Sequence, residues 1–164
     1  MSYHPSYRPI ADYLSHRPPM VLLDRIIEAA ESRIVCEVAL QVDSPFCDGA
    51  AVPGWVGVEY MAQTVGTLAG WRALEKRLPV KIGFLVGTRH YQSHVSQFRV
   101  GDALRITANE ELTANDGLVA MRCTIHTAAG TLLAEAALLV FQPDDLDAYL
   151  RQTSSAHENT SALK

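Results

Sequence analysis

The 164-residue chain has little cysteine, and its thiols are not arranged to bind a metal or to form a disulfide framework. The three cysteines, Cys36, Cys47 and Cys123, are odd in number and far apart, whereas metal sites and disulfide-rich domains use close pairs or even sets. The N-terminal residues also lack the apolar core of a signal peptide. These absences predict a single globular domain in a reducing cytoplasmic compartment, without a metal site.

The chain also lacks an excess of basic residues and an apolar run long enough to cross a membrane. It has 14 Lys and Arg against 18 Asp and Glu, a formal net charge of -4, whereas nucleic-acid-binding domains normally carry a clear basic excess. The most apolar segment, residues 55–71, contains Glu59 and Gln63 and is shorter than the ~20 residues of a membrane helix. We therefore expect neither nucleic acid nor a membrane as a partner.

Alternating apolar residues predict several half-buried β-strands. The clearest is residues 33–42, in which Glu37 and Gln41 face away from an apolar row made of Ile34, Cys36, Val38, Leu40 and Val42. Turn signals around Gly117 and Gly130 predict that the last three strands form consecutive hairpins. The other expected strands are residues 20–27, 80–92, 102–112, 118–127 and 131–142.

Residues 55–76 contain no proline and are too long for an ordinary strand, so we expect a helix. Apolar or small residues cover nearly the whole circumference of its first turns, and a helix of this kind must be buried on all sides. Gly57, Gly66 and Gly70 each weaken a helix by ~1 kcal/mol relative to alanine. We therefore expect other segments of the chain to pack very close to its backbone.

Two strands, one buried helix and four antiparallel strands predict an α+β domain. A single sheet can cover such a helix on most sides only by curling around it, which is the hotdog fold: a curled antiparallel β-sheet wrapped around one long central helix. By analogy, such sheets pair edge to edge as dimers. We expect the domain to span residues 1–152, with a short helix at 144–150 and a flexible tail at 153–164.

Three motifs occur in an order that resembles a known family. The central segment PFCDGAAVPGWVGVEYMAQ is similar to a pattern of H-F, P-G, an acidic residue and M-x-Q. HRPPMVLLDRI resembles an early H-R-x-P-x-x-L-x-D-R segment, and GFLVGTRHYQSHVSQFRVGDAL resembles a later strand region. Together they resemble the 3-hydroxyacyl-acyl-carrier-protein dehydratases, and in particular degenerate accessory members of aryl-polyene and polyketide-like pathways. The resemblance covers about residues 14–142.

The resemblance implies a hydro-lyase that removes water from a 3-hydroxyacyl chain carried as a thioester on acyl carrier protein. The catalytic carboxylic acid falls on Glu59, and Gly54 and Trp55 are the positions whose amides would polarise the thioester carbonyl. Gln63 lies one helical turn beyond the acid and is expected, with Gly54 and Trp55, to bind the substrate. Apolar surroundings favour the protonated form of a carboxylic acid, which suits donation of a proton to the leaving hydroxyl group. No metal or redox cofactor is implied, since the substrate carries its own phosphopantetheine.

The catalytic histidine of that family is missing. Its position, immediately before Phe46, is Pro45, and no histidine lies between His16 and His90. The base could be another histidine of this chain, foremost His90, with His94 and His16 behind it. It could instead come from a histidine-bearing partner subunit, the alternative that we favour. In other readings the chain binds acyl groups without catalysis, or is a hotdog thioesterase whose helix carboxylate activates water.

A basic cluster, Arg72, Lys76, Arg77 and Lys81, follows the apolar part of the helix. These cations could be a solvated helix end that complements the helix dipole. They could equally form a docking patch for an acidic carrier protein, where complementary charge speeds and orients the encounter. The expected partners are therefore acyl carrier protein and a second subunit, in a homodimer or in a heterodimer with another hotdog dehydratase.

Overall fold

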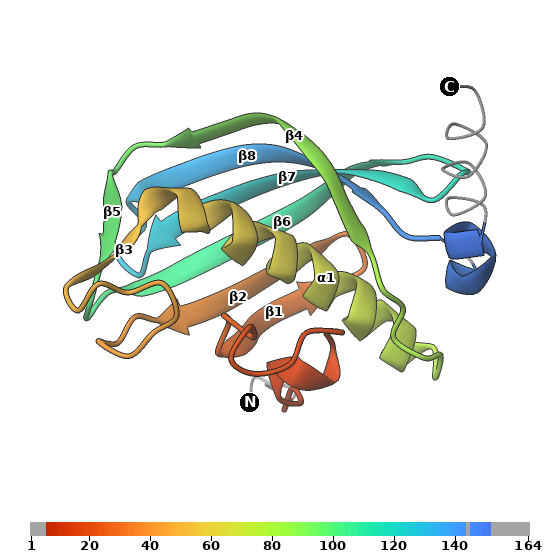
Figure 1. The fold of residues 1–164 in the computed structure, drawn as a ribbon, viewed down its shortest axis with the longest axis horizontal. Coiled ribbons are helices and arrows are strands. Elements are labelled where there is room, and N and C mark those ends of the chain that lie inside the picture. Colours follow the sequence, from red (N-terminus) through yellow and green to blue (C-terminus); the bar gives the residue numbers. More distant parts are fainter. Residues whose placement is uncertain (1–5, 144, 152–164) are drawn as a thin grey trace, which may run out of the picture.

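The computed structural model describes residues 6–143 and 145–151, in which a long helix lies across the concave face of a curled sheet (Figure 1). The predicted hotdog fold is confirmed. The predicted tail, residues 153–164, lies outside the described residues. The elements are η1 (Ile10–Asp12), β1 (Arg25–Ala30), β2 (Arg33–Ala39), β3 (Ala51–Pro53), η2 (Gly54–Val56), α1 (Gly57–Glu75), β4 (Phe84–Ser93), β5 (Gln97–Arg99), β6 (Ala103–Thr113), β7 (Leu118–Thr127) and β8 (Leu132–Phe141).

The main sheet has six strands in the order β1-β2-β6-β7-β8-β4, and every pairing in it is antiparallel. The predicted hairpins β6-β7 and β7-β8 are present, with Gly117 and Gly130 at positive φ in their turns. The strand that follows the helix, β4, pairs with β8 and forms one edge of the sheet. A small sheet of β3 and β5, which the sequence did not predict, supports the start of α1.

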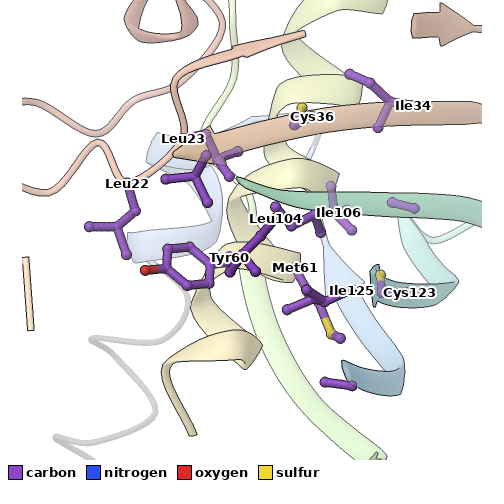
Figure 2. Packing of buried hydrophobic residues seen from close by; sticks show 14 of the residues in the cluster. Leu22, Leu23, Ile34, Cys36, Tyr60, Met61, Leu104, Ile106, Cys123 and Ile125 are labelled. Atoms are coloured by element: carbon purple, nitrogen blue, oxygen red, sulfur yellow. The ribbon is translucent and has the colours of Figure 1, made fainter. Parts of the chain in front are cut away.

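The core lies between α1 and the concave face of the sheet. Met61 of the helix is fully buried, and Figure 2 shows it beside Ile106 and Ile125 of the two central strands. Removing one such side chain from water stabilises the fold by about 1.5–3 kcal/mol. The alternation that predicted the strands is borne out, since the residues of the six-stranded sheet at 0–4% exposure are Ile34, Cys36, Val38, Leu104, Ile106, Ala108, Met121, Cys123, Ile125, Ala134, Ala136 and Leu138.

The helix glycines do admit close neighbours, as predicted. A Cβ on Gly70 would lie 1.9 Å from the backbone oxygen of Tyr13, and a Cβ on Gly57 would lie 2.3 Å from the hydroxyl of Tyr91. Both distances are far inside van der Waals contact, so a side chain at either position would force its neighbour to move, and at Gly70 that neighbour is backbone. The N-terminal segment and β4 can therefore pack directly against the backbone of α1.

Three sequence expectations need correction. The first strand begins at Arg25 rather than residue 20, because the backbone of Met20 and Leu22 bonds to a helix side chain instead of to a neighbouring strand. Val42 is 66% exposed, since the second strand ends at Ala39 and no longer fixes which way the chain faces. The segment predicted as a helix buried on all sides is not so buried, because Trp55, which the structure places in the turn η2 before α1, is 64% exposed.

One row of helix residues is also only half-buried, namely Glu59, Ala62, Gly66 and Ala69. Residues 146–151 are helical, close to the short helix expected at 144–150. Within the described ranges, every helix is too short or too polar to span a bilayer.

Candidate functional site

A cavity of about 210 Å³ runs beside the half-buried row of the helix. Glu59 lies on one wall, and the row continues through Ala62, Gly66 and Ala69. At a rise of 1.5 Å per residue these positions extend over about 15 Å of helix. The opposite wall is mainly apolar and comes from the sheet, with Phe84, Leu85, Val119, Met121, Val140 and Phe141. The cavity is thus a mainly apolar space along the helix, whose wall carries the acidic Glu59 and also the basic side chains of Arg72 and Lys81.

Glu59 is held by the side chain one helical turn further on. The amide nitrogen of Gln63 donates a hydrogen bond of 2.9 Å to Glu59 Oε1. Gln63 is itself fully buried and fixed by the backbone, since its Nε2 also donates to the Met20 carbonyl at 2.7 Å and its Oε1 accepts from the Leu22 N–H at 2.9 Å. The structure thus gives Gln63 a contact with Glu59, while its predicted contact with substrate stays a prediction, since Gln63 is not one of the residues that line the cavity.

The histidine nearest to this carboxyl group is His16. Its Nε2 lies 3.7 Å from Glu59 Oε1, and both side chains line the cavity. The foremost candidate base within this chain was His90, but His90 is exposed on β4 and is not one of the residues that line this cavity. His94 faces Glu135, at 3.4 Å between His94 Nε2 and Glu135 Oε1. Within one subunit the structure thus brings His16, and neither of the others, to the acidic group.

The two positions predicted to supply amide donors, Gly54 and Trp55, differ in what their N–H groups contact. The N–H of Gly54 donates to the Ser96 carbonyl at 2.9 Å, so it is already engaged. Trp55 lies in the first turn, where backbone N–H groups have no intrahelical acceptor. Its ring meets Phe46 edge-on at 5.9 Å, which brings the loop that contains Pro45 against the helix start. Trp55 therefore fits the predicted polarising role better than Gly54.

Tyr91 was missed at the sequence level. Its hydroxyl donates a hydrogen bond to the Gly54 carbonyl, and burial raises the pKa of this phenol. The contact ties β4 to the helix start. The only sequence signal for such a contact was Gly57, whose missing side chain makes room for the Tyr91 hydroxyl.

The basic cluster after the helix is partly engaged within the chain. Arg72 Nη2 lies 2.6 Å from Glu110 Oε2, and its guanidinium also donates to the Glu31 carbonyl. Burial alone would raise the pKa of Glu110, but hydrogen bonds from Thr113 and Arg72, with the Arg72 charge, lower it. Lys76 Nζ lies 3.7 Å from Glu31 Oε1. Arg72 thus has a structural role, whereas the ion pair that Lys76 makes is exposed. Contact of Arg72, Lys76, Arg77 and Lys81 with a carrier protein stays a prediction.

Comparison with known proteins agrees with this architecture. Residues 8–151 match the family described as "ApeP-like: ApeP dehydratase". The chain is 28% identical over 145 residues to the 3-hydroxyacyl-[acyl-carrier-protein] dehydratase FabZ of Anaeromyxobacter dehalogenans, covering 82% of this chain and 88% of that protein.

Among solved structures, a chain of the dehydratase heterocomplex ApeI:P from Xenorhabdus doucetiae is similar with a TM-score of 0.80 and 32% identity, over 88% of this chain and 97% of that one. The PaaI protein of E. coli, at 11% identity and a TM-score of 0.57, shares the fold over 71% of this chain and 80% of its own. Because the family match spans most of the sequence and the architecture agrees, the chain belongs to the ApeP-like dehydratase family.

Proposed function

We propose that this chain supplies the acidic half of a dehydratase site in a heterodimer with a second hotdog dehydratase. The substrate is a 3-hydroxyacyl chain held as a thioester on acyl carrier protein, and the product is the trans-2-enoyl thioester. The observation that carries the proposal is a single ionisable carboxyl group, Glu59, on the wall of an elongated apolar cavity. Such a cavity can hold an acyl chain, and the carboxyl group can exchange a proton with it.

The reaction needs one acid, one base and donors for the carbonyl oxygen. A base removes the proton from the carbon next to the thioester carbonyl, and the electron pair forms the double bond as the C–O bond to the hydroxyl group breaks. Glu59 gives its proton to that hydroxyl group, which leaves as water. N–H groups in the first helical turn, at Trp55, stabilise the negative charge on the carbonyl oxygen. The proton taken by the base restores the acid before the next turnover.

The base comes from the partner subunit in this proposal, because Pro45 has no group that can accept a proton. The similarity to a chain of the ApeI:P heterocomplex supports a two-subunit site. The edge strand β4 supports it as well, since three consecutive apolar residues of it, Phe84, Leu85 and Val86, are 36%, 43% and 57% exposed in the single chain. An exposed apolar edge strand is a template for pairing with another strand. Pairing there would also bring the partner next to the cavity wall to which Phe84 and Leu85 belong.

The test is a dehydration assay on the complex of this chain with its second hotdog subunit. A 3-hydroxyacyl carrier protein is incubated with the complex, and enoyl formation is followed by mass spectrometry as loss of water. Glu59→Gln keeps the shape of the side chain and its capacity to accept a hydrogen bond, but it cannot donate a carboxylic proton. Since general acid catalysis contributes about 10²- to 10⁴-fold, we expect a rate loss of that order.

The matched control is Glu111→Gln, which changes an exposed glutamate on β6 that pairs with Arg122. It should leave the rate unchanged. A Glu59→Gln complex that dehydrates at the wild-type rate would remove Glu59 from the mechanism. Release of free acid in place of enoyl product would identify a thioesterase instead.

A further inference from the structure

We propose that His16 is a positioning residue for Glu59. Together with Gln63 it directs a donor at one carboxyl oxygen, Oε1, and so leaves Oε2 as the oxygen that carries the proton to the substrate. This inference rests on the proposed function, in which Glu59 is the proton donor. It adds a role for this chain's own histidine that is separate from the missing base.

The first step concerns the orientation of Gln63. Its Oε1 faces a backbone donor, the Leu22 N–H, and its Nε2 faces a backbone acceptor, the Met20 carbonyl. Flipping the amide would break both bonds and leave a buried backbone N–H and a buried carbonyl without partners, which is costly. The nitrogen therefore points at Glu59 permanently. Because that nitrogen can only donate, Glu59 Oε1 must be an acceptor, and a proton on this carboxyl group resides on Oε2.

The second step concerns the imidazole. His16 presents Nε2 to the same Oε1 at 3.7 Å, and its Nδ1 is buried without a hydrogen-bond partner in the described part of the chain. A neutral ring with its proton on Nε2 fits this setting, since it directs the N–H at an acceptor and leaves only a lone pair unpaired. Catalytic contacts that are long in a free enzyme shorten when substrate binds. His16 thus becomes a second donor to Oε1 when this contact shortens.

The same geometry argues against His16 as the base. A base needs an unprotonated nitrogen that faces the substrate, whereas the accessible nitrogen of His16 faces Glu59 and the other is buried. His16 therefore complements a base supplied by the partner and does not replace it.

The position of His16 is set by packing of the N-terminal segment on α1. Tyr13 and Leu14 are buried, and their atoms occupy the space that side chains at Gly70 and Gly66 would fill. Two residues later the chain reaches His16, and further on it supplies the Met20 and Leu22 groups that hold Gln63. One segment thus delivers both donors of Glu59. A shift of the N-terminal segment on α1 should therefore move His16 and Gln63 together.

The experiment compares His16→Phe and His16→Gln in the complex, with 3-hydroxyacyl carrier protein as substrate. Phenylalanine keeps the ring without a donor, and glutamine can place an N–H close to the original Nε2. We expect His16→Phe to lower kcat by about 10- to 100-fold, the scale of a misplacement of about 1 Å, with little change in KM. His16→Gln should recover most of that loss. The matched control is His126→Gln, which should behave as wild type because His126 is a half-buried residue of β7 that does not line the cavity.

Two kinetic results would overturn the inference. A His16→Phe complex with wild-type kcat would show that the contact does not matter. A His16→Gln complex as slow as His16→Phe would show that the imidazole itself transfers a proton. If the wild-type complex forms no enoyl product, the proposed function fails, and nitrogen NMR of labelled protein then tests His16 directly. We expect the tautomer with the proton on Nε2, and the opposite tautomer would refute the arrangement.

Discussion

Adding one methyl group at Gly70 should both destabilise the fold and displace residues of the candidate site. On an exposed helix, Gly→Ala stabilises by ~1 kcal/mol. At Gly70 the added Cβ would lie 1.9 Å from the Tyr13 backbone oxygen and 2.7 Å from its carbonyl carbon. These are backbone atoms and cannot rotate away, so the N-terminal segment would have to move by about 1 Å or more.

The same helix contains its own control. A Cβ on Gly66 would meet one side-chain atom, Leu14 Cδ2, at 3.0 Å, and a leucine side chain can shift slightly. The gain in helix propensity is the same at both positions, so the difference in unfolding free energy between the two variants measures the effect of the clash. Overpacking typically costs 1–3 kcal/mol. We expect Gly66→Ala to change the free energy of unfolding by less than about 1 kcal/mol, and Gly70→Ala to lower it by about 1–3 kcal/mol.

Thermal unfolding measures this difference. For a domain of this size 1 kcal/mol corresponds to about 2–4 °C, so Gly70→Ala should lower Tm by roughly 2–12 °C. Because the displaced segment also carries His16, Gly70→Ala should reduce dehydration by the complex at temperatures where the protein is still folded. Equal Tm values for the two variants would refute the close approach of Tyr13 to the helix.

Three further predictions concern other parts of the molecule. Burial raises the pKa of Cys36 and of Cys123 to about 12, so a thiol reagent should modify Cys47 alone in the native protein and all three thiols after denaturation. The pKa of Glu110 is lowered in the fold from its ordinary 4.5, so the stability that its carboxylate contributes is present above pH 4.5 and is lost as the pH falls. Glu110→Gln should therefore be less stable than wild type near pH 7. Denaturant titrations should show this difference in the free energy of unfolding shrinking below pH 4.5. Val86→Lys puts a charge on the exposed edge strand, and analytical ultracentrifugation should show weaker association with the partner subunit, whereas unchanged association would exclude β4 as the contact.

The periodic parts of the fold could be predicted from the sequence because local pattern decides them. The strand at residues 118–127 was predicted with its observed limits, since alternation and a glycine turn mark both its face and its start. The small sheet of β3 and β5 escaped prediction because each strand has only three residues, too few for a period to show. The start of the first strand was misplaced because Met20 and Leu22 are apolar residues whose backbone bonds to Gln63, a residue about 40 positions away.

The candidate site was likewise predicted only in part from the sequence. A carboxylate in an apolar helix is visible in the sequence, and Glu59 does lie on the wall of the apolar cavity. Which histidine stands beside it was not visible, and His90 was ranked above His16. Only the packing of the N-terminal segment on the glycine face of α1 brings His16 to Glu59.

By itself, the sequence determined the curled sheet, the central helix and the presence of one acid in its apolar stretch, because strand and helix periods and residue polarity are local properties. The tertiary structure alone decided that His16 lies beside that acid and that the Gly54 N–H is already bonded to the Ser96 carbonyl. Such contacts depend on distances between residues far apart in the chain, and a linear pattern carries no measure of those distances.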